Sequence, residues 1–166
     1  MKLIEDWINW SVYMKQRIFT GSYDKCKKGN LISISGDRGR SVGFNGKALP
    51  QLAPKRNFWN IWYNQIGKVS EEENTKYYIE QYYRQVLSNR DIMQIIKDEN
   101  DPILLCFEDS SQFCHRHILA EYINIKYGLE VHEIEVTENL EIIQKDRPGN
   151  IRKILEQVIE QEQERD

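Results

Sequence analysis

The chain has 166 residues, of which 40% are hydrophobic and 30% are charged, and its formal net charge at pH 7 is −3. This size and composition are typical of one soluble globular domain that buries a core without disulfides, so we expect a single domain over residues 1–166. The slight negative charge argues against broad electrostatic capture of DNA or of an anionic membrane. Nucleic acid is not excluded as a partner, because basic residues can still cluster locally.

The cysteine count and the first residues bear on where the protein works. Three cysteines make an odd number, which argues against a disulfide framework and favours a reducing compartment. Glu5 and Asp6 interrupt the apolar run that a secretory signal needs, and no long apolar segment follows. We therefore predict a cytoplasmic protein with no membrane partner.

The first part of the chain predicts a helix, two strands, a long loop and a second helix. Apolar side chains follow helical spacing over residues 3–15, and short strands are predicted for RIFTG (17–21) and LISIS (31–35). The polar segment GDRGRSVGFNGKALPQLAP is a long loop of the kind that is often functional. A helix with an aromatic face then begins near Pro54 and ends at Gly67.

The remaining elements alternate in type. A capping box, Ser70 with Glu73, begins a helix that continues to Leu87, and a shorter helical piece follows over residues 92–96. Strands are predicted for ILLCF (103–107) and VHEIEV (131–136), with a helix between them that ends at Gly128. After Pro148 and Gly149, an amphipathic helix is expected to dock through Ile151, Ile154, Leu155, Val158 and Ile159.

Alternating strands and helices predict an α/β fold with a mainly parallel sheet. Ligands bind such sheets outside the carboxyl ends of the strands. Three loops should meet there: TGSYDK after the first strand, SGDRGR after the second and EDSSQF after the strand 103–107. We therefore expect Thr20, Ser35 and Arg38 to bind a substrate, although SGDRGR lacks the G-x-G-x-x-G pattern of a phosphate-binding loop.

Reactive side chains gather in residues 104–123, which read LLCFEDSSQFCHRHILAEYI and hold two of the three cysteines and two of the three histidines. A helix beginning near Cys114 places backbone N–H groups with partial positive charge beside Cys114 and His115. Ser110 or Ser111 is expected to cap this helix. Arg116 offers forked donors, so the sequence predicts an anion-binding site at the helix start.

Helical geometry separates the two histidines of this stretch. His115 projects into the apolar stripe of the helix and should point inward, whereas His117 falls beside Glu121 and should face solvent. A cysteine at a helix start has a lowered thiol pKa, so Cys114 is a candidate nucleophile and His115 a candidate proton carrier. Glu108 is expected to orient His115 or to act as a base.

Structural alternatives remain open for these residues. Cys106 lies in an apolar strand, where a cysteine is often a small buried hydrophobe, and Arg116 can pair with Glu108 or Asp109. Cys106, Cys114 and His115 could hold a metal, although the C-x7-C-H spacing matches no common zinc pattern. The aromatic side chains at helical spacing favour a core over base stacking; they are Trp59, Trp62, Tyr63, Tyr78, Tyr82 and Tyr83.

The stretch LLCFEDSSQFCHRHILAEYI resembles the signature of the domain-of-unknown-function family 488, in which LLC-[FY]-E is followed by a short loop, CHR and a helix. Other segments match in order, namely IFTGSYDK, LISISGD, LPQLAPKRNFW and YYRQVL, so the resemblance covers residues 18–135. It implies a Rossmann-like three-layer α/β sandwich, with N- and C-terminal helices added and residues 137–166 as a C-terminal helical extension. Carried over by position, the motif residues are Cys106, Glu108, Cys114, His115 and Arg116, with 52–54 as a further element.

Three functions are consistent with this sequence. The leading hypothesis is an enzyme acting on a small anionic or nucleotide-like substrate, with Cys114, His115, Glu108 and Cys106 as catalytic residues. A non-catalytic module that binds a nucleotide or phosphate is the first alternative. A structural Cys/His cluster that packs or holds zinc is the second. The sequence names no cofactor and no reaction.

Overall fold

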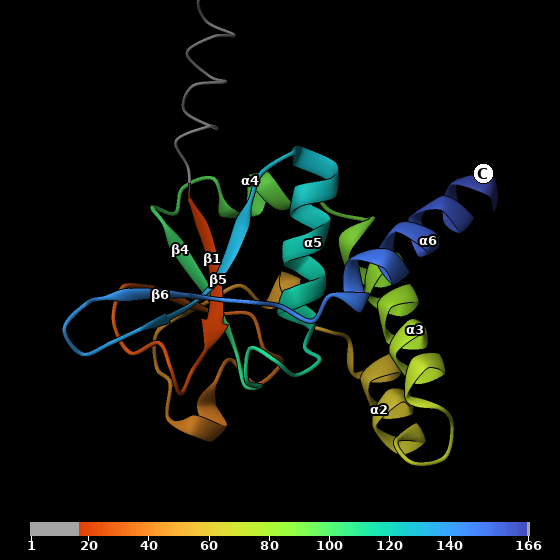
Figure 1. The fold of residues 1–166 in the computed structure, drawn as a ribbon, viewed down its shortest axis with the longest axis horizontal. Helices are drawn as coiled ribbons and strands as arrows, with labels where there is room; N and C mark the ends of the chain where they lie inside the picture. The colour runs from red at the N-terminus through yellow and green to blue at the C-terminus, as the bar shows by residue number, and fades with distance from the viewer. Residues whose placement is uncertain (1–16, 166) are drawn as a thin grey trace, which may run out of the picture.

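The computed structural model describes residues 17–165, so the helix predicted over residues 3–15 lies outside the described residues. A six-stranded sheet with the strand order β3-β2-β4-β1-β5-β6 forms the centre of the molecule (Figure 1). Only the β5–β6 pair in this sheet is antiparallel. The strands are β1 (Ile18–Ser22), β2 (Asn30–Ser33), β3 (Lys47–Ala48), β4 (Pro102–Cys106), β5 (Val131–Val136) and β6 (Ile142–Lys145). The predicted α/β class with a mainly parallel sheet is confirmed.

The described helices are α2 (Arg56–Gln65), α3 (Glu71–Tyr82), α4 (Ile92–Ile96), α5 (His115–Tyr127) and α6 (Asn150–Arg165). The long helices α3, α5 and α6 lie together with α2 on one side of the sheet (Figure 1). The last turn of the α3 region, Tyr83–Leu87, is a π-helical turn, and short 3-10 turns cover Arg40–Val42 and Pro50–Leu52 in the long loop. No helix within residues 17–165 has both the length and the apolar character needed to cross a bilayer.

Local sequence signals explain where several helices begin and end. The Ser70 hydroxyl accepts a hydrogen bond from the Glu73 N–H at 3.1 Å, as expected for a residue that caps a helix start. Gly67 and Gly128 follow α2 and α5 with φ values of 80° and 70°, a left-handed conformation that glycine adopts without steric cost. The predicted boundaries at these three positions are confirmed.

The core lies between the sheet and α5, with α3 and α6 packed on the far side of α5. Every residue of β1 and β4 is buried, which agrees with strands that are covered on both faces. Ile151, Leu155 and Val158 of α6 are buried and Ile154 and Ile159 pack partly against the same core, so the predicted docking of this helix is confirmed. Strands β3 and β6 were not predicted, because β3 is only two residues long and β6 is exposed throughout.

Parallel strands β1, β2 and β4 end at the same edge of the sheet, and this edge carries the loops predicted to converge. Ser35 follows β2, Cys106 ends β4, and the loop after β4 leads directly into α5. The fold therefore brings the chemistry-bearing segment 104–116 next to the segment after β2.

Candidate active site

A pocket of about 490 Å³ opens at the carboxyl ends of β2 and β4. Its floor contains Ser35, Cys106, Glu108, Cys114 and His115, four of which were predicted as catalytic and one as substrate-binding. The side chains of Cys106, Cys114 and His115 are each only 4% exposed. The pocket that the sequence predicted at this sheet edge therefore exists, and it holds the Cys-His cluster.

Helix α5 begins differently from the prediction. Its N-cap residue is Cys114, with extended φ and ψ of −157° and 147° and no capping hydrogen bond from its side chain. Neither Ser110 nor Ser111 caps the helix, because both hydroxyls donate to the Asp109 carboxylate at 3.3 and 3.1 Å. The Cys114 sulfur consequently remains at the open helix start, where N–H dipoles favour negative charge.

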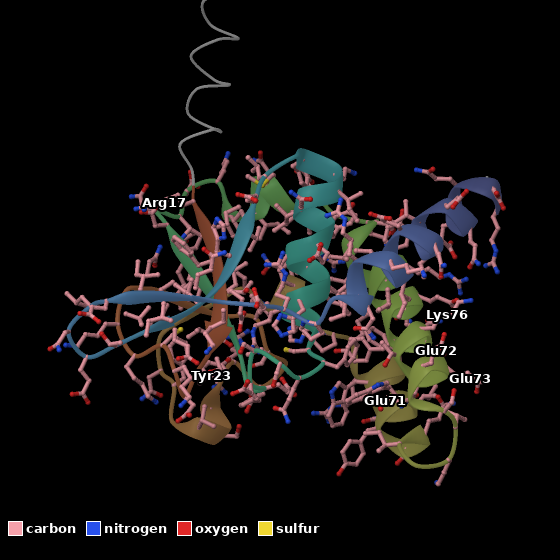
Figure 2. The ribbon with its side chains drawn as sticks, viewed as in Figure 1. Arg17, Tyr23, Glu71, Glu72, Glu73 and Lys76 are labelled. Atoms are coloured by element: carbon pink, nitrogen blue, oxygen red, sulfur yellow. The ribbon has the colours of Figure 1, made fainter. Side chains whose placement is uncertain are left out.

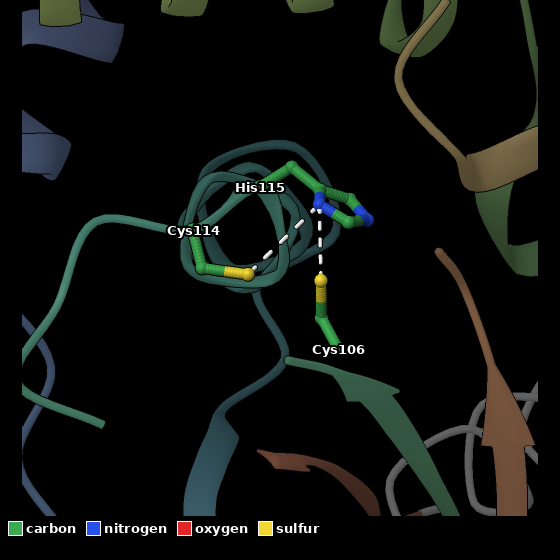
Figure 3. Close-up of side chains that lie close together, drawn as sticks. All are labelled: Cys106, Cys114 and His115. Carbon is green, nitrogen blue, oxygen red and sulfur yellow. Dashed lines mark hydrogen bonds between the residues drawn. The ribbon is translucent and has the colours of Figure 1, made fainter. Parts of the chain in front are cut away.

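The orientation of His115 follows from one backbone contact. Its Nε2 lies 2.7 Å from the carbonyl oxygen of Ile34, which can only accept a hydrogen bond, so Nε2 carries the proton. In the neutral ring, Nδ1 is then an acceptor, and it lies 3.6 Å from the Sγ of Cys106 and 3.9 Å from the Sγ of Cys114 (Figure 3). The Tyr82 ring packs edge-on against the imidazole, with the two ring centroids 5.6 Å apart, and limits the movement of the imidazole. The site thus presents one fixed nitrogen lone pair to two thiols.

The two thiols have opposite electrostatic environments. Burial by itself would raise the pKa of Cys114, but a hydrogen bond from Cys106, the charge that His115 carries once it has taken up a proton, and the positive charge of Arg116 hold that pKa well below its usual value. Burial and the neighbouring Cys114 thiolate raise the pKa of Cys106 well above its usual value. Cys114 is therefore the thiolate of the pair, and Cys106 remains protonated and donates to it.

Glu108 is the third titratable group of the pocket. Its Oε2 lies 3.5 Å from the Cys106 Sγ. Burial, together with the negative charge on Cys114, raises the pKa of Glu108 from 4.5 to about 7. Near neutral pH this carboxyl group is therefore present in both protonation states, which is what a general acid or base requires.

The cluster also has the shape of a metal site. The Nδ1 of His115 and the Sγ atoms of Cys106 and Cys114 all lie within 4.8 Å of one another. A histidine whose other nitrogen donates to a backbone carbonyl is typical of zinc ligands. Three protein ligands facing a pocket would leave a fourth position open.

Arg116 and Thr20 do not line the pocket, contrary to their predicted role in substrate binding. Arg116 is fully buried and forms a bidentate pair with Glu133 of β5, through Nε at 3.1 Å and Nη2 at 2.8 Å. Its Nη2 also donates to the backbone carbonyl of Glu108 at 2.7 Å. The Thr20 hydroxyl donates to the same Glu133 carboxylate at 2.7 Å. Helical rotation turns Arg116 away from the pocket and toward this carboxylate.

The prediction that His117 faces solvent is wrong, because its side chain is fully buried. The chain between β6 and α6 covers that side of α5, where Arg147 pairs with Glu121 at 3.0 Å. Burial, reinforced by the charge of Arg116, lowers the pKa of His117 from 6.5 to about 4. Within residues 17–165 neither ring nitrogen makes a hydrogen bond, and Nδ1 lies 3.9 Å from the Oε1 of Glu133.

Two further predicted residues lie after β2. The buried Ser35 hydroxyl lies 2.6 Å from the Tyr23 hydroxyl and donates to Asp37 at 3.1 Å, so it lines the pocket with its hydrogen bonds already made. Arg38 is exposed, has a φ of 61° and is not part of the pocket lining. Ser35 therefore holds the loop in place, whereas Arg38 lies outside the pocket lining.

The opposite wall of the pocket comes mostly from α2 and α3, which the sequence did not assign to the site, with one residue from the loop before α5. Six side chains form it: Arg56, Trp59, Asn60, Trp62, Tyr78 and Phe113. The aromatic residues were predicted to be core, which holds for Tyr78 and Tyr82, whereas Trp59 and Tyr63 are 38% and 58% exposed. One sequence pattern could have revealed this wall. Arg56, Trp59 and Asn60 recur at three-and-four spacing, so charged, polar and aromatic side chains share one face of the helix, which a fully buried helix would not show.

The fold and the site together define an α/β protein with a buried Cys-Cys-His cluster at the strand ends. The chain matches the family model DUF488-N3a, described as the active DUF488-N3 subclade, over residues 22–127. This match spans more than half of the 166 residues, so the protein belongs to the DUF488 family, and the resemblance based on the CHR motif is confirmed. No curated protein and no solved structure matches the chain.

Proposed function

We propose that the protein is an enzyme that uses the Cys114 thiolate as a nucleophile on a small nucleotide-like substrate. The observation that carries this proposal is the geometry of His115, whose Nδ1 faces the Cys114 sulfur at the open start of α5 in the pocket wall. The description of the matching subclade as active agrees with a catalytic role. A working thiolate needs a reducing compartment, so the proposal includes a cytoplasmic location.

The residues of the pocket suffice for a two-step displacement. The Nδ1 of His115 takes the Cys114 proton, and the thiolate attacks an electrophilic carbon of the substrate while protonated Glu108 gives its proton to the leaving group. A water molecule then attacks that carbon and gives a proton to the Glu108 carboxylate, which breaks the carbon–sulfur bond and restores the thiolate. Cys106 stabilises the thiolate by donating its S–H hydrogen bond.

The walls of the pocket favour a substrate with a planar ring and an anionic group. Aromatic side chains form much of one wall, and planar rings bind such surfaces by stacking. Because Arg116 is neutralised by Glu133, we assign the anion to Arg56 at the pocket rim instead. This arrangement fits a nucleotide-like molecule.

Thiol reactivity tests the proposal directly. After brief treatment with iodoacetamide near pH 6, peptide mapping should find Cys114 alkylated about a hundredfold faster than Cys26, because only thiolate reacts. Cys26 is a matched internal control, since it is equally buried but burial raises its pKa to about 11. Alkylation of Cys26 or Cys106 ahead of Cys114 would contradict a Cys114 nucleophile. A nucleotide turnover screen with C114S as control then separates catalysis from binding alone.

Zinc binding by the same cluster is the second candidate function, favoured by the three ligand atoms within 4.8 Å of one another. Metal analysis of the purified protein should then find about one zinc per chain, and C106A should lose it. Both thiols would resist alkylation until a chelator is added. Rapid Cys114 alkylation that is unchanged by a chelator would exclude this candidate.

A further inference from the structure

We propose that a single-stranded polynucleotide binds across α2 and the loop after β2, with one of its bases in the pocket. The proposal rests on the pocket of the proposed function and extends its substrate from a free nucleotide to a strand. Three observations carry it: the charge of this region, two exposed stacked rings, and the extent of the surface beyond the pocket.

The charge of the region is opposite to that of the chain. Residues 38–70 contain no aspartate or glutamate and six basic residues, whereas the net charge of the whole chain is −3. Lys47 pairs with Glu99, but within residues 17–165 the other five form no ion pair. These five are exposed, and they are Arg38, Arg40, Lys55, Arg56 and Lys68. Unpaired cations of this kind attract a phosphate backbone.

The exposed rings lie at the mouth of the pocket. Trp59 lines the pocket and stacks on Tyr63 one turn further along α2, with ring centroids 5.1 Å apart and ring planes 11° apart. Burial does not explain these rings, since Trp59 is 38% and Tyr63 is 58% exposed. Successive unpaired bases bind to single-strand proteins by continuing such stacks.

Asn60 adds a group that can contact a base edge. It lies one residue after Trp59 and lines the pocket, and its amide makes no hydrogen bond within the part of the chain that the structure describes. An amide donates and accepts at once, which suits the mixed donor and acceptor edge of a base. Arg56, one turn earlier on α2, is placed to contact the adjoining phosphate.

The surface is larger than one nucleotide needs. Tyr63, Arg38 and Arg40 do not line the pocket, so a mononucleotide held there leaves them without a ligand. Glu71, Glu72 and Glu73 lie in the first turn of α3, which follows α2, and repel phosphates there (Figure 2). The strand therefore runs from Tyr63 across the pocket mouth toward Arg38 and Arg40.

Fluorescence anisotropy with a labelled single-stranded DNA of about twelve nucleotides tests this proposal. We expect saturable binding that weakens with salt, and W59A should weaken it about tenfold or more because a stacking partner is lost. R56Q should reduce the slope of log K against log salt by about 0.7, the loss of one phosphate contact. K153Q, which removes an exposed lysine of α6, is the matched control and should change neither quantity.

Each other outcome has a definite meaning. The melting temperature of every variant checks that it folds. Equal binding of a duplex, loss of binding in K153Q, or binding of AMP but not of the strand would overturn the proposal. Rapid Cys114 alkylation without strand binding would support the proposed enzyme and overturn only the proposal that it binds a strand. Strand binding by a protein whose Cys114 is unreactive would support a non-catalytic binding module instead of the proposed enzyme.

Discussion

Two neighbouring groups of buried residues on α5 have opposite characters. Cys114 and His115 face the pocket, where the His115 Nδ1 lies 3.9 Å from the sulfur of a thiol whose pKa is depressed. Arg116, next in sequence, faces the sheet and forms a closed pair with Glu133 at 2.8 Å. A ligand in the pocket can reach Cys114 and His115, whereas Arg116 and Glu133 are closed off from the pocket and from solvent.

The difference shows that the residues of a short sequence motif need not act as one unit. The CHR sequence places three polar side chains in succession, but helical rotation of about 100° per residue sends them to different surroundings. Two of them meet thiols and a pocket, and the third meets a carboxylate from β5. We therefore assign chemistry to the Cys-His group and fold stability to the Arg116–Glu133 pair.

Among the variants that test this comparison, R116M should cause the largest change in the free energy of unfolding. Glu133 then loses its cationic partner in a sealed site, and breaking a buried pair in this way costs about 3–5 kcal/mol. Urea unfolding measures the loss. The double variant R116M/E133L is the control and should recover most of the stability, because no uncompensated charge remains. A change below about 1 kcal/mol in R116M would show that the pair is not the structural element we assign.

Replacing His117 with Leu should have the next largest effect. The folded pKa of His117 is lowered from 6.5 to about 4, so its contribution to stability is present above pH 6.5 and is lost as the pH falls toward 4. H117L does not titrate, so at pH 4 it should exceed the unaltered protein in unfolding free energy by about 3 kcal/mol. Unfolding curves at pH 4 and pH 7 measure the gain. An equal loss of stability in both proteins on acidification would show that His117 is solvated.

Replacing Glu108 with Gln gives the smallest expected effect and has the opposite pH dependence. The folded pKa of Glu108 is raised from 4.5 to about 7, so the stability linked to its protonation is present below pH 4.5 and is lost as the pH rises through 7. E108Q should therefore be as stable as the unaltered protein at pH 5 and more stable at pH 8, by about 1 kcal/mol or less because the group is half-buried. Melting temperatures at the two pH values test this. A gain at pH 5 instead would mean that Glu108 is ionised and paired.

Most of the fold follows from local sequence patterns. The buried strand β4, the capping residue Ser70, the stop at Gly128 and the apolar face of α6 all depend on neighbours within a few residues, so periodicity and turn chemistry predict them. The location of the Cys-His site follows from the same logic, because parallel strands present their carboxyl ends at one edge.

The partners of Arg116 and His117 follow only from the tertiary structure. Glu133 reaches Arg116 because β5 pairs with β1 and places Glu133 opposite Thr20, 113 residues away in sequence. His117 is buried because the chain after β6 returns over α5, and β6 itself has no apolar pattern to reveal it. Only the tertiary structure shows that Trp59 is exposed. Helical spacing predicts which residues share a face of a helix, but not whether another element covers that face. The sequence by itself determined the fold class and the place of the Cys-His cluster, and long-range pairing decided which side chains of the CHR motif face the pocket.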